Sequence, residues 1–227
     1  MPLPACIAID GPAAVGKSTV GRIVARNLGR QFIDTGEMYR ALTWLARREG
    51  IAMDDATALG KLASEARMDL PAQPDTARCS VLINGIDVTD EIHSPEVELS
   101  VSQISGVSEV RQAMVVKQRS MARQQQVVMS GRDIGSVVLP QAGLKVFLMA
   151  PLNERARRRY VEQQDKGTDT TYEAIIDDLE RRDRIDVDRP LSPLRPAVDA
   201  RVIDTEGLSA RQVADAIVKL AKEVDCR

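Results

Sequence analysis

Short apolar runs alternate with amphipathic stretches along most of the chain. Five runs dominated by aliphatic residues predict β-strands, and they occupy residues 7–9, 31–33, 127–129, 144–149 and 202–204. Between them, apolar residues recur with the three- and four-residue spacing of a helix that buries one face. This alternation predicts an α/β fold in three layers, with a five-stranded parallel sheet flanked by helices on both faces.

The amphipathic stretches set the expected helices. Gly29 suits the end of the first helix, and Ser209 suits the N-cap of the last. Residues 164–171 are polar and predict a loop. The helices are expected at 17–28, from the Asp34-Thr35-Gly36 turn to about Gly50, at 54–67, 95–123 and 153–163, in a stretch ending near Arg184, and at 209–223.

The alternation breaks between residues 68 and 92. Here the strand-like segments Cys79–Ile83 and Ile86–Val88 are separated by Asn84-Gly85. An Asn-Gly pair in this position is a strong hairpin signal, because both residues accept the positive φ angles of a tight turn. A hairpin joins antiparallel strands, so we expect a small β insert outside the parallel sheet.

A glycine-rich loop lies between the first predicted strand and the first predicted helix. It fits the P-loop pattern G-x-x-x-x-G-K-[ST], in the strand–loop–helix context that the motif needs. Loop N–H groups at a helix N-terminus bind phosphate oxygens, while Lys17 would contact the β- and γ-phosphates and Ser18 a magnesium ion. The sequence thus predicts a nucleoside triphosphate site made of Gly11, Pro12, Ala13, Ala14, Val15, Gly16, Lys17, Ser18 and Thr19.

Arginines cluster after the fourth predicted strand. Arg155, Arg157, Arg158 and Arg159 share one predicted helix, where they form a solvated face, a nucleic-acid patch or a lid over phosphates. A net charge of −2 and an aromatic content of 3% disfavour nucleic acid as the partner. The solvated face and the lid stay open as alternatives.

Three further arginines stand apart from this helix. Arg40, Arg132 and Arg189 each follow a predicted strand end or turn, on the side of the sheet where the P-loop lies. Because guanidinium groups match the geometry of phosphate oxygens, these three residues are candidates for holding a second phosphate group.

The composition is that of a globular protein with an aliphatic core. Of the 227 residues, 44% are apolar, and no apolar run approaches the length that a bilayer requires. Cys6, Cys79 and Cys226 are odd in number and lack the spacing of a metal site or a disulfide framework. We expect a cytoplasmic monomer that binds neither nucleic acid nor membrane.

An obvious general base is missing from the sequence. The one histidine, His93, falls in the insert. An alcohol acceptor would call for a base, whereas a phosphate monoester, with its second pKa of about 6, is already an anion at neutral pH. Such a nucleophile needs alignment and charge neutralisation, and no base. The lack of an obvious general base therefore favours phosphoryl transfer to a phosphate.

The chain resembles the bacterial cytidylate kinases, which are P-loop nucleoside monophosphate kinases. The match spans residues 7–204 in the expected order. It is carried by Ile9-Asp10-Gly11-Pro12 with the P-loop, Asp34-Thr35-Gly36 with Tyr39-Arg40, Ser102-Gln103, Val110-Arg111, Gly131-Arg132-Asp133-Ile134-Gly135, Arg155-Ala156 with Arg158-Arg159, Arg182-Asp183, Asp186, Arg189 and Pro193-Leu194.

The resemblance implies a role for each matched residue. Ser102, Arg111 and Asp133 would read the cytosine edge, whose amino donor suits a carboxylate. Asp186 would bind the ribose, with Thr35 and Arg182 at the same substrate site. The phosphate of CMP would be held by Arg40, Arg132 and Arg189, and the lid over ATP would include Arg158 and Arg159. The catalytic set would be Lys17, Arg132, Arg158 and Arg189.

Two departures from the family pattern bear on the ATP site. Ala14 and Val15 fill free positions of the loop where relatives often carry smaller or more polar residues. No predicted central strand ends directly in the carboxylate expected of a magnesium ligand, because Met129 leads to Ser130. The sequence therefore assigns Mg²⁺, the cofactor of ATP, to Ser18 alone.

The resemblance also implies one kinase unit and two small-molecule substrates, ATP and CMP or dCMP. Its core would comprise 1–60, 100–152 and 185–227, its monophosphate-binding insert about 61–99, and its lid about 153–184. A P-loop kinase for UMP, AMP or a small alcohol is the alternative, which the insert and the cytosine set disfavour. A nucleotide-dependent switch specific for guanine would need an Asn-Lys-x-Asp element, and none occurs.

Overall fold

A computed structural model describes residues 3–71, 80–189 and 191–225. Its central sheet is parallel throughout, and its strands run in the order β2-β6-β1-β7-β8. The predicted five-stranded sheet is therefore confirmed. The strands are β1 (Leu3–Asp10), β2 (Gln31–Asp34), β6 (Val127–Gly131), β7 (Ala142–Met149) and β8 (Arg201–Asp204). Cys79, Pro190 and Cys226 lie outside the described residues.

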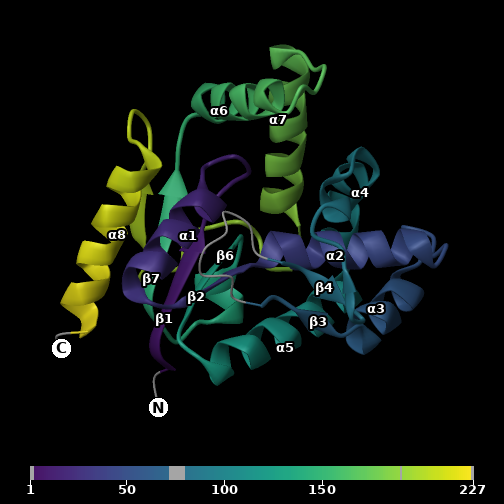
Figure 1. Cartoon of the computed structure of the whole chain (residues 1–227), viewed down its shortest axis with the longest axis horizontal. Coiled ribbons are helices and arrows are strands. Elements are labelled where there is room, and N and C mark those ends of the chain that lie inside the picture. The colour runs from purple at the N-terminus through teal and green to yellow at the C-terminus, as the bar shows by residue number, and fades with distance from the viewer. Residues whose placement is uncertain (1–2, 72–79, 190, 226–227) are drawn as a thin grey trace.

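The two faces of the sheet pack against different helices. Side chains alternate along a strand, so Ile7 and Ile9 face one layer while Cys6 and Ala8 face the other. The first layer holds α1 (Lys17–Leu28) and α8 (Ala210–Asp225), and Figure 1 shows α8 on the left of the sheet. The second holds α2 (Thr35–Arg48), α3 (Ala56–Glu65) and α5 (Ser108–Gln124). The predicted three-layer arrangement is confirmed.

The helix expected over residues 95–123 is in fact two helices. α4 (Pro95–Gly106) ends before Val107, whose φ of −70° and ψ of 125° are extended, and α5 begins at Ser108. The break lets α4 pack against α2 and α7 (Tyr172–Asp188), while α5 packs against α3. One straight helix could not reach both sets of neighbours.

The hairpin predicted in the insert is present. β4 (Leu82–Ile83) and β5 (Ile86–Asp87) are antiparallel, and the φ angles of Asn84 and Gly85 are 51° and 80°. A third strand, β3 (Met68–Asp69), pairs with β4 and was not expected. The short 3₁₀ helix η1 (Glu91–His93) follows. Val81, Ile83 and Val88 are buried in the same cluster as α2 and α3, so the small sheet packs onto the helical layer.

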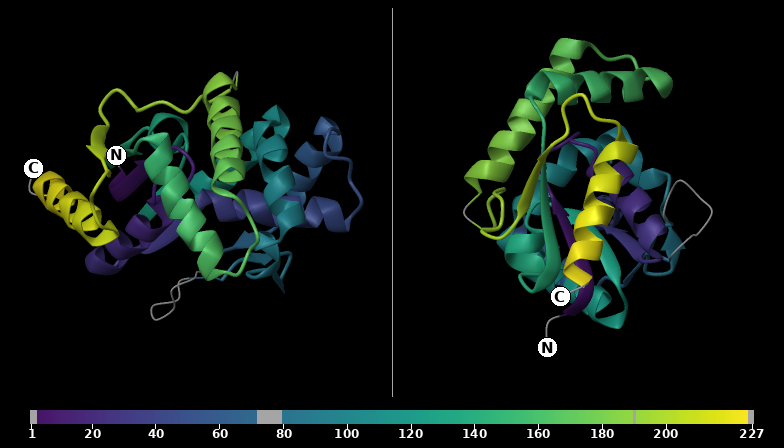
Figure 2. Two further views of the ribbon diagram at one scale, coloured as in Figure 1. Left: turned by 90° about the horizontal axis from the view of Figure 1, so that it is seen from above. Right: turned by 90° about the vertical axis from the view of Figure 1, so that its left-hand side faces the viewer.

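The arginine-rich helix pairs with the helix that follows it. α6 (Leu152–Asp165) and α7 are each longer than expected, so the loop between them shortens to 166–171. Ala156, Ile175 and Leu179 bury apolar surface together with Ala13 of the P-loop. The pair therefore rests on the loop after β1, at the upper end of the sheet in Figure 1 and in the right-hand view of Figure 2.

Candidate active site

The P-loop adopts the conformation that its glycines permit. Gly11 has a φ of +152°, and a Cβ there would lie 2.4 Å from the carbonyl oxygen of Leu148. Only glycine fits this approach of the loop to β7. Lys17 Nζ donates to the Pro12 carbonyl at 2.6 Å, so the ammonium group lies over the loop. Burial, and then the nearby charge of Arg132, lower the pKa of Lys17, and bound phosphates would reverse this effect.

An acidic residue from the neighbouring strand contacts the P-loop hydroxyl. Ser18 Oγ donates to Asp34 Oδ2 at 2.5 Å, and Asp34 is the last residue of β2. The other carboxylate oxygen accepts from the Gly36 amide at 2.9 Å and caps α2. The sequence assigned magnesium to Ser18 alone and treated Asp34 as part of a turn. Its position directly after a predicted strand was the signal that this assignment missed.

A second carboxylate fixes the turn that follows β6. Asp10, at the end of β1, accepts from the amides of Ile134 and Gly135 at 2.8 Å each. These residues begin the π-helical turn η2 (Ile134–Val138). Burial raises the pKa of Asp10 to about 6, although the two hydrogen bonds act in the opposite direction. Asp10 therefore ties the strand that leads into the P-loop to the Gly131–Gly135 segment.

Two of the three residues predicted to read cytosine are paired. The Asp133 carboxylate accepts a hydrogen bond from the Arg111 guanidinium, and both side chains are buried. Arg111 Nη1 also donates to the carbonyl of Ser105 at 3.2 Å. The third predicted reader, Ser102, is half-buried one turn earlier on α4. The geometry thus brings Arg111 and Asp133 together next to the end of α4.

Arg189 lies against the same carboxylate. Its Nη2 is 3.8 Å from Asp133 Oδ1, and its Nη1 is 3.7 Å from Asp186 Oδ1. Nε donates to the Ser192 carbonyl at 2.5 Å, but Nη2 is buried without a hydrogen-bond partner. Burial, and then the charge of Arg111, lower the pKa of Arg189. A buried N–H without an acceptor is costly, so this nitrogen is suited to an anionic ligand.

The other two predicted phosphate-binding arginines have acidic partners. Arg132 Nε lies 2.6 Å from Asp186 Oδ2. Arg40 Nε lies 2.7 Å from Glu98 Oε1, and Glu98 belongs to α4. Arg182, expected beside Asp186, contacts this same glutamate through Nη2 at 3.2 Å. Glu98 is the residue that the sequence analysis missed here, since its partners are remote in the chain.

The arginines of α6 divide between the two interpretations left open. Arg157 is exposed and pairs with Glu154, as a solvated face predicts. Arg158 also pairs with Glu154, at 2.8 Å, but it reaches the P-loop as well: its Nη1 lies 3.4 Å from the Val15 carbonyl, and its Nη2 donates to the Thr205 carbonyl at 2.6 Å. The buried Arg155 likewise donates to the P-loop carbonyl of Ala13, at 3.1 Å.

Two predicted site residues are bonded to partners within the protein. Arg159 Nη1 pairs with Glu162 at 3.0 Å on its own helix. The buried hydroxyl of Thr35 donates to the Ser130 carbonyl at 2.9 Å, which joins the start of α2 to β6. Thr35 therefore helps to fix the start of α2 against β6.

Comparison with known proteins places these features in one family. The sequence model of the cytidylate kinase family matches residues 7–223. Cytidylate kinase of Bacillus subtilis strain 168 is 45% identical over 217 residues, which cover 96% of each chain. Cytidylate kinase of Desulforamulus reducens is 48% identical over 213 residues, covering 94% of this chain and 95% of its own. The chain belongs to the cytidylate kinase family.

The fold also resembles that of a solved structure with little sequence similarity to this chain. A crystal structure of an uncharacterized protein from Eubacterium ventriosum superposes with a TM-score of 0.52 at 11% identity, over 96% of this chain and 98% of that one. At this identity the likeness concerns the fold alone, and it agrees with the three-layer architecture described above.

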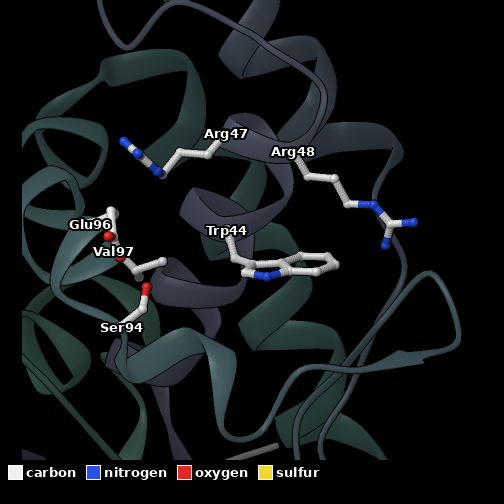
Figure 3. Close-up of a pocket in the computed structure, with 6 residues that line it drawn as sticks. All are labelled: Trp44, Arg47, Arg48, Ser94, Glu96 and Val97. Carbon is white, nitrogen blue, oxygen red and sulfur yellow. The ribbon is translucent and has the colours of Figure 1, made fainter.

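A pocket of about 320 Å³, lined by none of the residues predicted to bind nucleotides, lies between the end of α2 and the start of α4 (Figure 3). The Arg48 guanidinium lies over the Trp44 ring at 5.1 Å. The pocket is lined by Trp44, Arg47, Arg48, Ser94, Glu96 and Val97.

The described residues include no cluster of three or more His, Cys, Asp or Glu side chains able to hold a metal ion. They also include no helix with the length and apolarity to cross a membrane.

Proposed function

We propose that this chain transfers the γ-phosphoryl group of ATP to CMP, and also to dCMP, giving ADP and the corresponding diphosphate. Family membership supports the activity, and one observation carries the assignment of the acceptor side. The paired Arg111 and Asp133 lie beside Arg189, whose buried Nη2 lacks an acceptor. A phosphate would supply the acceptor that Arg189 Nη2 lacks, and a cytosine edge offers both donors and acceptors to Asp133 and Arg111.

The acceptor residues lie where an open α/β sheet binds ligands. Asp133 follows the carboxyl end of β6, and β6 is the immediate neighbour of β1, which leads into the P-loop. Ligands of such sheets bind beyond the carboxyl ends of the strands. The donor and the acceptor would therefore meet above adjacent strands, which favours direct in-line transfer without a covalent intermediate.

No general base is required for this transfer. The acceptor phosphate is already anionic at neutral pH, so the protein has to align two phosphates and neutralise their charge. Lys17 and Arg158 would serve the donor side, together with Arg159. Arg40, Arg132 and Arg189 would serve the acceptor phosphate, with Asp186, Arg182 and Thr35 toward the ribose.

The residues at the start of α1 fit a magnesium ion. Ser18 Oγ and the Asp34 carboxylate are both oxygen donors, which Mg²⁺ prefers, and they lie within hydrogen-bond distance of each other. We propose that Ser18 binds the ion that accompanies ATP and that Asp34 holds it directly or through water. The ion would neutralise charge on the β- and γ-phosphates.

The moving parts of this kinase would be its two peripheral regions. We assign the monophosphate-binding insert to residues 61–99 and the lid to residues 153–184, around a core of 1–60, 100–152 and 185–227. Packing of α6 and α7 on Ala13 supports the lid assignment, since this contact couples both helices to the P-loop.

The test is an ADP-release assay with ATP and one of CMP, dCMP, UMP or AMP as acceptor. We expect strong turnover with CMP and dCMP, and weak turnover with AMP. A reaction without acceptor measures ATP hydrolysis and is subtracted. Strong turnover with AMP or UMP and none with CMP would refute the proposed acceptor and favour another nucleoside monophosphate kinase.

A further inference from the structure

A single carboxylate, that of Glu98, lies between two arginines from different helices. Its Oε1 accepts from Arg40 Nε at 2.7 Å, and its Oε2 lies 3.2 Å from Arg182 Nη2. Arg40 belongs to α2, Glu98 to α4 and Arg182 to α7. The glutamate side chain is only 17% exposed, so this is a sheltered bridge among three helices.

The bridge leaves part of the Arg40 guanidinium available. Glu98 takes the Nε end, whereas Nη1 points to the start of α2, where a Cβ on Gly36 would lie 3.0 Å from it. That backbone is bonded to Asp34, the partner of Ser18. The carboxylate thus holds Arg40 at Nε, while Nη1 lies beside the start of α2.

Arg182 contacts Glu98 at both its main chain and its side chain. Its Nη2 lies within 3.3 Å of the Glu98 main-chain carbonyl as well as near the carboxylate, and its Nε is 2.8 Å from Asp178 Oδ2. These contacts fasten α7, one of the two helices resting on the P-loop, to α4. Glu98 therefore sets the position of Arg182 and of its helix face.

The electrostatics keep this carboxylate ionised. Burial would raise the pKa of Glu98, but the charge of Arg40 and its hydrogen bond, with further contributions from Arg182 and Arg159, outweigh burial and hold the pKa at about 2. A Glu98→Gln variant would therefore remove a charge and one strong acceptor while keeping nearly the same shape.

We propose that Glu98 is a positioning residue for the acceptor nucleotide: it orients Arg40 toward the phosphate and Arg182 toward the ribose. The inference rests on the proposed function in that Arg40 is taken to bind that phosphate. If Glu98 instead occupied the place where the phosphate binds, its charge would repel the phosphate. Nη1 of Arg40, which Glu98 does not contact, favours the positioning role. The two roles predict opposite changes in the KM for CMP when the charge of Glu98 is removed.

Steady-state kinetics of Glu98→Gln distinguish these roles. We expect the KM for CMP to rise about tenfold, as loss of a charge-assisted hydrogen bond predicts, while the KM for ATP changes less than about twofold. Glu96→Gln, on the same helix and exposed, is the matched control and should leave both constants unchanged. A lower KM for CMP in Glu98→Gln would overturn the proposal and make Glu98 a competitor of the phosphate.

A double-mutant cycle supplies a readout that a purely structural role would not move. Once Arg40 is removed, Glu98 has only Arg182 left to position, so adding Glu98→Gln to Arg40→Ala should raise the KM for CMP clearly less than Glu98→Gln raises it in the wild type. Additive effects would contradict the proposal. If Glu98→Gln does not fold, Glu98→Asp, which keeps the charge on a shorter side chain, takes its place with a smaller rise expected.

Failure of the proposed function would give a different result. If the wild-type chain uses AMP or UMP in place of CMP, the same cycle is measured with that acceptor, because Glu98 acts on the phosphate and the ribose and not on the base. An unchanged KM for the acceptor that the wild-type enzyme does use would overturn the inference about Glu98 alone.

Discussion

Arg132 Nε lies 2.6 Å from Asp186 Oδ2 and joins the segment after β6 to α7. Burial would raise the pKa of Asp186, but the charge and hydrogen bond of Arg132 outweigh it and lower that pKa. The sequence assigned the two residues to different parts of CMP, Arg132 to the phosphate and Asp186 to the ribose. Their pairing indicates that each also keeps the other in place, so substitution of one should disturb both subsites.

Loss of Arg189 should weaken the acceptor site most. Arg189→Ala removes a guanidinium that faces both Asp133 and Asp186 and leaves the charge of those carboxylates less compensated. We expect kcat/KM for CMP to fall by about 10²- to 10³-fold, as loss of a charged transition-state contact predicts. Arg195→Ala, an exposed arginine nearby, is the control. A near-wild-type value would remove Arg189 from the acceptor site.

Asp133 should matter for the acceptor and little for the donor. Asp133→Asn replaces the carboxylate that accepts from Arg111 by an amide with a donor on one side. We expect kcat/KM for CMP to fall about 10- to 100-fold, with ATP binding measured by titration nearly unchanged. Asp188→Asn removes an exposed carboxylate and serves as the control. Equal weakening of CMP and ATP would show that Asp133 does not read the base.

Asp34 should set the magnesium requirement. Asp34→Asn retains an oxygen that can cap the Gly36 amide, so α2 should remain intact. The Ser18 hydroxyl, however, loses its charged acceptor. We expect the Mg²⁺ concentration for half-maximal ADP release to rise at least about tenfold, as for other residues that orient metal ligands. An unchanged Mg²⁺ dependence with a stable fold would contradict this role.

Asp10 should give the fold a measurable pH dependence. Its pKa is about 6 in the folded chain against an ordinary 3.8, so the folded state binds this proton more tightly. The stability from this group is therefore fully present below pH 3.8 and is lost as the pH rises through 6. Urea unfolding of wild type and Asp10→Asn at pH 4 and pH 7 measures this effect. We expect the free energy of unfolding of the wild type, relative to that of Asp10→Asn, to fall by about 2–3 kcal/mol between pH 4 and pH 7. The same difference between the two proteins at both pH values would contradict this prediction.

The sequence predicted the sheet well because each strand is a compact aliphatic run. It did not predict the break at Val107, because helical spacing continues on both sides; Gly106, a residue type that often ends helices, stands directly before the break and was the signal that was missed. Its predicted site residues converge in part: Arg111 with Asp133, and Arg132 with Asp186. Glu98 was not predicted as a site residue, because its partners lie 58 and 84 residues away along the chain. Such pairings depend on tertiary packing, which periodicity does not report.

The place of β1 in the sheet also bears on how the chain acquires its structure. Ile9 pairs with Ser130 on one side and with Val146 on the other, although it leads directly into the P-loop. Contacts this distant in sequence form slowly. During synthesis, which proceeds from the N-terminus, the nucleotide loop would emerge early yet gain its supporting strands only after β7 has left the ribosome. A nascent chain that stops before β6 should therefore be unable to retain ATP.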